Sequence, residues 1–134
     1  MEIKFKVWND KDKFFAADGY NYFINKHGKL FIGSEVANGE YEIEPCKDFM
    51  KPVFLAGKED RNGIEWKEGD IFNISTGNNM ILIHDETEYP GWKFEYLSGP
   101  AKGMKVSAHV NALSKEEIIG NKFENPELIE ALQI

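Results

Sequence analysis

The clearest candidates for chemistry in this sequence are one histidine and three nearby carboxylates: His84, Asp85, Glu86 and Glu88. An imidazole beside carboxylates could bind zinc, or could act as an acid–base group with a raised affinity for protons. The other histidines, His27 and His109, fall in a predicted turn and a predicted strand, without ligand spacing. Because runs of charge usually belong to solvated loops, we interpret the group as a loop. A metal-assisted hydrolase built around His84 and Asp85 is kept as an alternative.

A second set of carboxylates surrounds two glycine-containing turns: Asp60, Glu65, Glu68 and Asp70. These side chains could gather around a metal ion, but they lack the fixed oxygen-ligand spacing of a calcium-binding loop. Turn chemistry accounts for the same stretch, because Asn62-Gly63 is a strong hairpin signal and Gly69 can supply a positive φ. We therefore predict two tight turns that frame a short strand, and no bound metal.

Nucleophilic residues lack the partners that catalysis would require. Cys46 is the only cysteine, so neither an intramolecular disulfide nor a paired-cysteine zinc site can form. No serine lies in a Gly-x-Ser-x-Gly context, and the sequence has no glycine-rich loop of the phosphate-binding kind. We expect a protein that is not an enzyme and that uses no cofactor.

Aromatic residues are abundant, with ten Phe, five Tyr and three Trp in 134 residues. Four of them are candidates for one binding face: Trp66, Trp92, Phe94 and Tyr96. Such rings could stack on the bases of a single-stranded nucleic acid, with Lys4, Lys6 and Lys93 against the phosphates. Alternate residues of a strand share one face, however, so the last three rings also fit a packed core or a surface for a protein partner.

The charge of the chain argues against nucleic acid. Its formal net charge of −7 repels phosphate backbones, whose binding normally requires a basic patch. The amino-terminal residues alternate charged and apolar side chains, and no later stretch approaches the roughly 18 apolar residues of a membrane span. We expect a soluble cytoplasmic protein that acts on a protein partner, with a small-barrel nucleic-acid binder as the alternative.

The strand pattern predicts a mainly β fold, α+β at most. Short alternating or apolar runs are separated by turns rich in Gly, Asn and Asp. Within a single domain of 134 residues, we predict an amino-terminal meander over residues 1–44 and a barrel-like subregion over residues 50–134. The small antiparallel sheets of the second subregion are expected to form a partly open, SH3-like barrel, an expectation based on analogy.

Helix signals appear only near the carboxyl end. Asn125 fits an N-cap and Pro126 the first helical position, which predicts a short helix from Pro126 to about Leu132. A capping-box pattern from Ser114 to Glu117 predicts an additional helix start.

Two blocks of this sequence resemble the YopX family of phage and prophage proteins. The first block is Phe54–Ile71 (FLAGKEDRNGIEWKEGDI) and the second block is Ile118–Leu128 (IIGNKFENPEL). The opening residues, Glu2–Trp8, also match the usual start of the family. The sequence departs from the family at Ala56, where Thr is usual, and at Val53, where a polar residue is usual. Neither change affects the predicted turns.

The resemblance implies a β-rich phage or prophage accessory protein that associates with itself and acts in the cytoplasm of a bacterial host. It implies no activity, because the family has no established biochemical function. The motif residues expected to be structural are Asn62, Gly63, Gly69, Asp70, Gly120, Asn125 and Pro126. We expect a homo-oligomer that contacts a host or phage protein, with no membrane association.

Overall fold

The computed structural model describes residues 4–17, 21–73, 78–84, 91–108 and 116–132. These residues are mostly in antiparallel sheets, one of which is a half-barrel, with a short helix near the carboxyl end. This confirms the predicted mainly β class. The chain divides into two compact units: Phe5–Val53 is the smaller unit, and Met1–Lys4 with Phe54–Ile134 is the larger unit. No helix in the described part of the chain is long and apolar enough to cross a membrane.

The smaller unit begins with a short hairpin. Its strands are β1 (Phe5–Asn9) and β2 (Phe14–Phe15), and Trp8 pairs with Phe15 across them. Trp8 is completely buried, and its ring meets that of Phe15 edge to face with centroids 4.9 Å apart. Val7 is also buried, on the opposite face of the strand from Trp8. Burial in β1 is therefore not confined to the one face that alternation of charged and apolar residues predicts.

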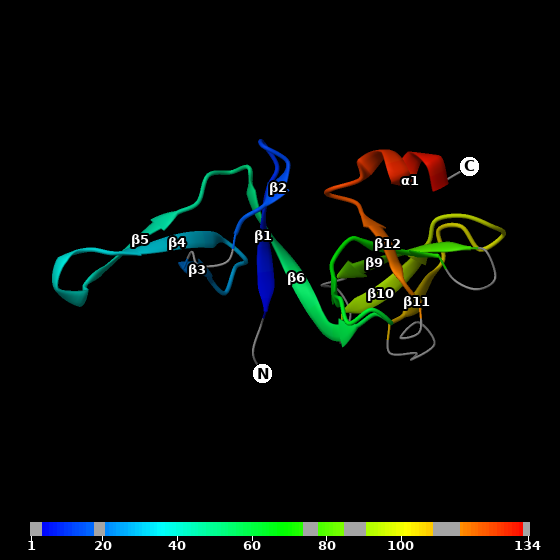
Figure 1. The fold of residues 1–134 in the computed structure, drawn as a ribbon, viewed down its shortest axis with the longest axis horizontal. Helices are drawn as coiled ribbons and strands as arrows, with labels where there is room; N and C mark the ends of the chain where they lie inside the picture. Colours follow the sequence, from blue (N-terminus) through cyan, green and yellow to red (C-terminus); the bar gives the residue numbers. More distant parts are fainter. Residues whose placement is uncertain (1–3, 18–20, 74–77, 85–90, 109–115, 133–134) are drawn as a thin grey trace. The chain divides into compact units, whose positions relative to one another are not determined.

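A three-stranded antiparallel sheet completes the smaller unit (Figure 1). In the order β3-β4-β5, its strands are Asn21–Ile24, Leu30–Glu35 and Tyr41–Pro45. A short 3-10 turn, η1 (Ala37–Gly39), joins β4 to β5. Phe23 lies over Gly33, where an added Cβ would lie 2.7 Å from the Phe23 ring. Leu30 is buried, but Phe23 and Ile43 are 44% and 58% exposed, so part of this sheet leaves apolar side chains in solvent.

The larger unit contains most of the regular structure. Strand β6 (Met50–Glu59) enters it from the smaller unit and pairs with β7 (Glu65–Lys67). A five-stranded sheet follows in the order β11-β10-β9-β8-β12. In chain order its strands are β8 (Asp70–Asn73), β9 (Asn79–His84), β10 (Trp92–Tyr96), β11 (Lys105–Ser107) and β12 (Ile118–Asn121). Helix α1 (Pro126–Leu132) comes after β12.

Two hydrophobic clusters are built from alternate residues of this sheet, whose side chains point to its opposite faces. The first cluster consists of Trp66, Phe72, Met80, Leu82, Phe94 and Ala108. The second consists of Ile71, Ile81 and Leu97, against which Leu128, Ile129 and Leu132 of α1 pack. Consecutive residues such as Ile71 and Phe72 fall in different clusters, because neighbouring side chains of a strand point to opposite faces. The strands are therefore apolar on both faces.

Helix α1 confirms the start at Pro126 and the end near Leu132 that the sequence predicted. The helix expected from the capping-box pattern is wrong: Ser114 lies outside the described residues, and Ile118–Asn121 forms strand β12. Tertiary contacts explain the difference. Strand β12 pairs with β8, and the backbone N–H of Ile118 donates to the side chain of Asp60. Two consecutive β-branched residues also favour a strand over a helix.

The Asn62-Gly63 turn joins β6 to β7 as predicted, and Glu59 pairs with Glu65 across it. Gly63 has φ of +76°, and no atom lies within 4 Å of a Cβ built on it. We expect Gly63→Val to lower the free energy of unfolding by about 1 kcal/mol, from backbone strain alone. Gly63→Asn should cost less, because Asn tolerates this region. Urea denaturation midpoints measure both, and an unaltered midpoint for the valine variant would contradict the positive φ.

Candidate functional site

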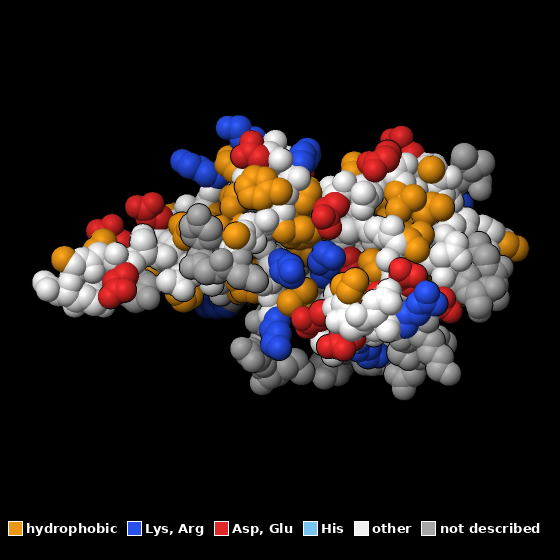
Figure 2. Space-filling model, in the orientation of Figure 1, with side chains coloured by type: hydrophobic (Ala, Val, Ile, Leu, Met, Phe, Trp, Pro, Cys, Tyr) orange, Lys and Arg blue, Asp and Glu red, His pale blue; other side chains and the backbone are white. Residues whose placement is uncertain are grey.

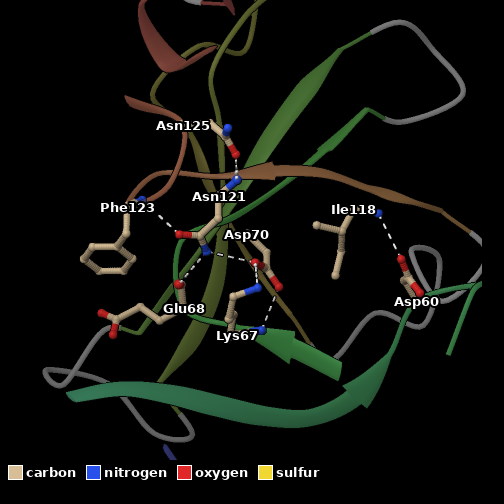
Figure 3. Close-up of polar contacts among 8 residues, drawn as sticks. All are labelled: Asp60, Lys67, Glu68, Asp70, Ile118, Asn121, Phe123 and Asn125. Carbon is tan, nitrogen blue, oxygen red and sulfur yellow. Dashed lines mark hydrogen bonds and ion pairs between the residues drawn. The ribbon is translucent and has the colours of Figure 1, made fainter. Parts of the chain in front are cut away.

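Asp70 is the centre of a buried polar network in the larger unit (Figure 3). It is the first residue of β8, and its exposed fraction is 0%. Its Oδ2 accepts a hydrogen bond from the backbone N–H of Lys67 at 2.8 Å. Its Oδ1 accepts from the Lys67 ammonium at 3.0 Å and from the Asn121 side-chain amide at 2.9 Å. The carboxylate is thus bonded both to the turn before it and to the neighbouring strand.

Asn121 ends β12 and is the cross-strand partner of Asp70. Its side-chain NH₂ also donates to the carbonyl of Glu68 at 3.2 Å, and its Oδ1 accepts from the N–H of Phe123 at 2.9 Å. Its backbone N–H donates to Oδ1 of Asn125 at 3.2 Å. This one residue therefore connects the β7–β8 turn, β12 and the start of α1.

Asp60 forms a second network at the β6–β7 hairpin, and its side chain is 5% exposed. Its Oδ1 accepts from the N–H groups of Asn62 and Ile64 at 2.8 and 2.9 Å, which fixes the turn. Its Oδ2 accepts from the N–H of Ile118 at 3.1 Å, which attaches β12 to the hairpin. Both buried aspartates therefore join the first sequence block to the second.

The two aspartates have pKa values shifted in opposite directions. Burial alone would raise the pKa of Asp60, but the N–H groups of Ile118, Ile64 and Asn62 donate to its charged form and lower the pKa below its ordinary value. Burial raises the pKa of Asp70, and the hydrogen bonds and charge of Lys67 with the amide of Asn121 offset this only in part. Donors to the carboxylate decide the first case and desolvation decides the second.

The lowered pKa of Asp60 predicts a loss of stability in acid. An unfolded aspartate titrates near pH ~4, so above that pH the contribution of Asp60 is fully present. Below it the unfolded chain takes up the proton first, and the contribution is lost as pH falls through the lower folded-state pKa. The difference in unfolding free energy between wild type and Asp60→Asn should therefore shrink from about pH 5 to about pH 2. Urea titrations across this range measure it; a constant difference would contradict the shift.

Gly120 allows β12 to pass close to α1. A Cβ at this position would lie 2.6 Å from Cδ2 of Leu128 and 3.1 Å from Oδ1 of Asn125. A larger residue would therefore displace the helix side chain that packs against the second cluster, or the amide that bonds Asn121. The backbone of Gly69 also connects neighbouring segments: its N–H donates to the carbonyl of Leu82, and its carbonyl accepts from the N–H of Lys122.

These contacts hold the two sequence blocks together in the fold. Their buried carboxylates accept hydrogen bonds from backbone and side-chain groups of the chain itself, and they belong to separate networks. Within the described ranges, no group of three or more His, Cys, Asp or Glu side chains is placed to hold a metal ion. The arrangement therefore holds β12 and α1 against the β6–β7–β8 region through hydrogen bonds.

The four candidate aromatic residues all pack in the first cluster. Trp66 and Phe94 are 1% and 2% exposed, with ring centroids 5.4 Å apart in an edge-to-face contact. Trp92 and Tyr96 are partly buried against the same cluster, so β10 presents alternate residues to one face as predicted. A base cannot stack on a fully buried ring, so Trp66 and Phe94 act here as core. Binding through the exposed parts of Trp92 and Tyr96 stays a prediction.

In the structure His84 contacts two aromatic rings, and Cys46 is partly buried. The centroid of the His84 ring lies 5.3 Å from that of Phe54 and 4.9 Å from that of Trp92. The carboxylates that could join it in a metal or acid–base site, Asp85, Glu86 and Glu88, lie outside the described residues. Burial raises the pKa of the Cys46 thiol, which lowers the fraction of reactive thiolate at neutral pH.

Sequence patterns did not predict that Lys67 and Asn121 bond to Asp70. Neither residue has a local signal, since Lys67 follows a short predicted strand and Asn121 lies in the stretch after the predicted capping box. Both residues belong to the YopX-like blocks, and this was the available sign of their importance. It did not indicate that the two blocks contact each other. The exposed apolar residues Phe23 and Ile43 were also missed, because alternation predicts a strand without saying which of its faces is covered.

This chain is similar to a known protein family and to two solved structures. The family model of YopX protein matches residues 4–130. The crystal structure of protein EF1440 from Enterococcus faecalis is similar, with a TM-score of 0.57 and 19% sequence identity over 96% of this chain and 99% of that chain. The crystal structure of yopX from Bacillus subtilis has a TM-score of 0.56 and 16% identity over 93% and 94% of the two chains.

No curated protein matches the chain. The two solved structures are below 25% identity and therefore show the fold alone. The family match covers almost the whole length, and it includes both blocks whose residues meet at Asp60 and Asp70. The chain belongs to the YopX family.

Proposed function

We propose that this protein is a non-enzymatic phage or prophage accessory protein that acts in the cytoplasm of a bacterial host through contacts with other proteins and with copies of itself. The observation that carries the proposal is the exposed apolar surface of the β3–β4–β5 sheet. Phe23 and Ile43 are 44% and 58% exposed. Exposed apolar groups that lie together on one element mark interaction sites.

Strand register places these side chains together. Phe23 pairs with Phe31, and Phe31 pairs with Pro45, so the three side chains lie on one face. Ile43 pairs with Gly33 and lies on the same face, beside the Phe23 ring that covers Gly33. The face has large apolar groups at its edges and a glycine at its centre. It is therefore a shallow apolar surface that a second protein surface can cover.

The use of the buried carboxylates supports a non-enzymatic role. Asp60 and Asp70 are the buried acidic side chains among the described residues, and each accepts three hydrogen bonds from the chain. A general acid or base must reach a substrate proton. Nucleic-acid binding is the weaker candidate, because two of its four proposed stacking rings are buried and the net charge is −7.

Light scattering coupled to size-exclusion chromatography tests self-association. At micromolar concentration we expect a mass above that of one chain, which falls toward one chain in the variant Phe23→Ser. Met104→Ser is the matched control, because Met104 is an equally apolar residue, 58% exposed, on the larger unit. A strict monomer at all concentrations would contradict self-association, and equal effects of both substitutions would contradict the assignment to this sheet.

A further inference from the structure

The open edge of strand β5 has the backbone groups, charge and apolar surface to bind another strand. We infer that this edge accepts an extended segment of a partner protein in which lysine or arginine alternates with apolar residues. The inference rests on the proposed function, since it names the kind of partner that the smaller unit contacts. It is argued from three properties of β5: the direction of its backbone groups, its charge and the faces on which its side chains lie.

The hydrogen-bond alternation of an antiparallel pair fixes which backbone groups of β5 are outward. At the two ends of the β4–β5 pair, the N–H of Cys46 donates to Leu30 and the N–H of Val36 donates to Glu40. The register between these ends pairs Ile32 with Glu44 and Ser34 with Glu42. Hydrogen-bonded pairs recur at every second residue. Glu42 and Glu44 therefore bond inward to β4.

The intervening residues of β5 present their backbone groups to the other side. Tyr41 and Ile43 direct their N–H and C=O groups outward, and Pro45 directs its C=O outward, because their partners form non-hydrogen-bonded pairs with β4. Strand β5 is the last strand of its sheet in the described structure. An edge with free donors and acceptors is a template for strand addition, and proline closes it at one end only.

The charge of this hairpin selects a basic partner. Residues 30–46 contain no lysine or arginine and four glutamates: Glu35, Glu40, Glu42 and Glu44. Figure 2 shows acidic side chains over the β4 and β5 region of the smaller unit. Natural edge strands are commonly protected by lysine, whereas this one is acidic and would attract a basic strand.

The two faces of β5 specify an alternating partner. Glu42 and Glu44 lie on the face opposite Ile43, which is 58% exposed and continues the apolar surface of Phe23. A strand added beside β5 would place successive residues against these two faces in turn. Lysine or arginine would meet the glutamates, and apolar residues would extend the surface of Ile43. Main-chain hydrogen bonds would supply affinity and the side-chain alternation would supply specificity.

A labelled synthetic peptide that alternates lysine and valine, with blocked termini, is the direct probe. We expect it to bind the full chain in a fluorescence-anisotropy titration, with affinity that falls as salt is added. The glutamate–valine peptide should bind at least tenfold more weakly. A lysine–valine peptide methylated on alternate backbone nitrogens keeps the charge and cannot pair fully, and it should lose binding to the same extent. No binding of the first peptide, or equal binding of all three, would overturn the inference.

Two protein variants separate the edge from the charge. Ile43→Pro removes an outward N–H without breaking the β4–β5 ladder, so it should abolish peptide binding while the circular dichroism spectrum is retained. Glu42→Lys combined with Glu44→Lys should reduce binding at least tenfold. Glu124→Lys combined with Glu127→Lys, two exposed positions on the larger unit, is the matched control and should leave binding within about twofold. Binding that survives Ile43→Pro would show that the edge is not the site.

Amide hydrogen exchange distinguishes strand pairing from a purely electrostatic contact, which would leave the exchange rates of the β5 amides unchanged. In the free protein the amides of Tyr41 and Ile43 should exchange quickly, and those of Glu42 and Glu44 slowly. Peptide binding should protect the two outward amides, Tyr41 and Ile43. Protection of Ile43 that depends on protein concentration without peptide would place a second copy on the edge, which overturns the basic-strand inference and supports self-association. A monomer that binds the peptide would contradict only the self-association part of the proposed function.

Discussion

Replacing Asp70 by alanine is expected to lower the free energy of unfolding of the larger unit by about 3 kcal/mol. The carboxylate is completely buried and accepts from the Lys67 backbone N–H, the Lys67 ammonium and the Asn121 amide. Its removal takes away an acceptor shared by three N–H donors, one of them on the Lys67 ammonium, which is 14% exposed. Loss of a single acceptor therefore affects β7, β8 and β12 together.

Urea denaturation of the larger unit, followed by tryptophan fluorescence, measures this change. Glu117→Ala is the matched control, because it removes a carboxylate from an exposed ion pair with Arg61 and should alter stability by about 0.5 kcal/mol at most. Combining Asp70→Ala with Asn121→Ala should cost less than the sum of the single changes, because the two side chains are bonded to each other. Strict additivity would show that the hydrogen bond contributes nothing.

Replacing Trp66 by alanine should destabilise the larger unit by about 4 kcal/mol, because a fully buried indole leaves a cavity that its neighbours cannot fill. Trp66 contacts Phe72 and Phe94 edge to face, with ring centroids 5.3 and 5.4 Å away. The Lys58 ammonium lies 5.6 Å from the Trp66 ring centroid and donates to the carbonyl of Ala108 at 3.0 Å. The substitution thus weakens the centre of the first cluster.

The conservative change Trp66→Phe should be much milder, within about 1 kcal/mol of wild type. The indole N–H of Trp66 is buried and has no hydrogen-bond partner among the described residues. Phenylalanine loses packing volume but also removes this unsatisfied donor, and the two effects oppose each other. Thermal and urea unfolding compare the two variants. A loss for Trp66→Phe as large as that for Trp66→Ala would mean that the indole N–H is bonded in solution.

Local patterns in the sequence predicted the elements whose cause is local. Alternation identified β1 and β10, and the Asn-Gly pair identified the β6–β7 hairpin. Asn125-Pro126 marked the start of α1 correctly, because an N-terminal proline disfavours any earlier helical turn. Each of these signals depends on residues close together in the chain.

Contacts between distant residues account for what the sequence did not predict. Local pattern predicted a helix where strand β12 lies, because the hydrogen-bond partners of β12 are far away in the sequence: Asp60 is 58 residues from Ile118, and Asp70 is 51 residues from Asn121. The burial of Trp66 and the exposure of Ile43 likewise depend on which elements cover them. Matching the family located the blocks, but pairing of their side chains is a property of the tertiary fold.

The separation of the two blocks also bears on synthesis of the protein. When the last residue of β8, Asn73, leaves the ribosome, 48 more residues must follow before its partner strand β12 is complete at Asn121. During that interval the Asp70 carboxylate has no Asn121 to bond, and the edge of β8 is unpaired. Domains generally form as units once their residues have emerged. A chain interrupted before β12 would therefore expose a buried acid and an open strand edge, features that favour aggregation or degradation over release of a partly working product.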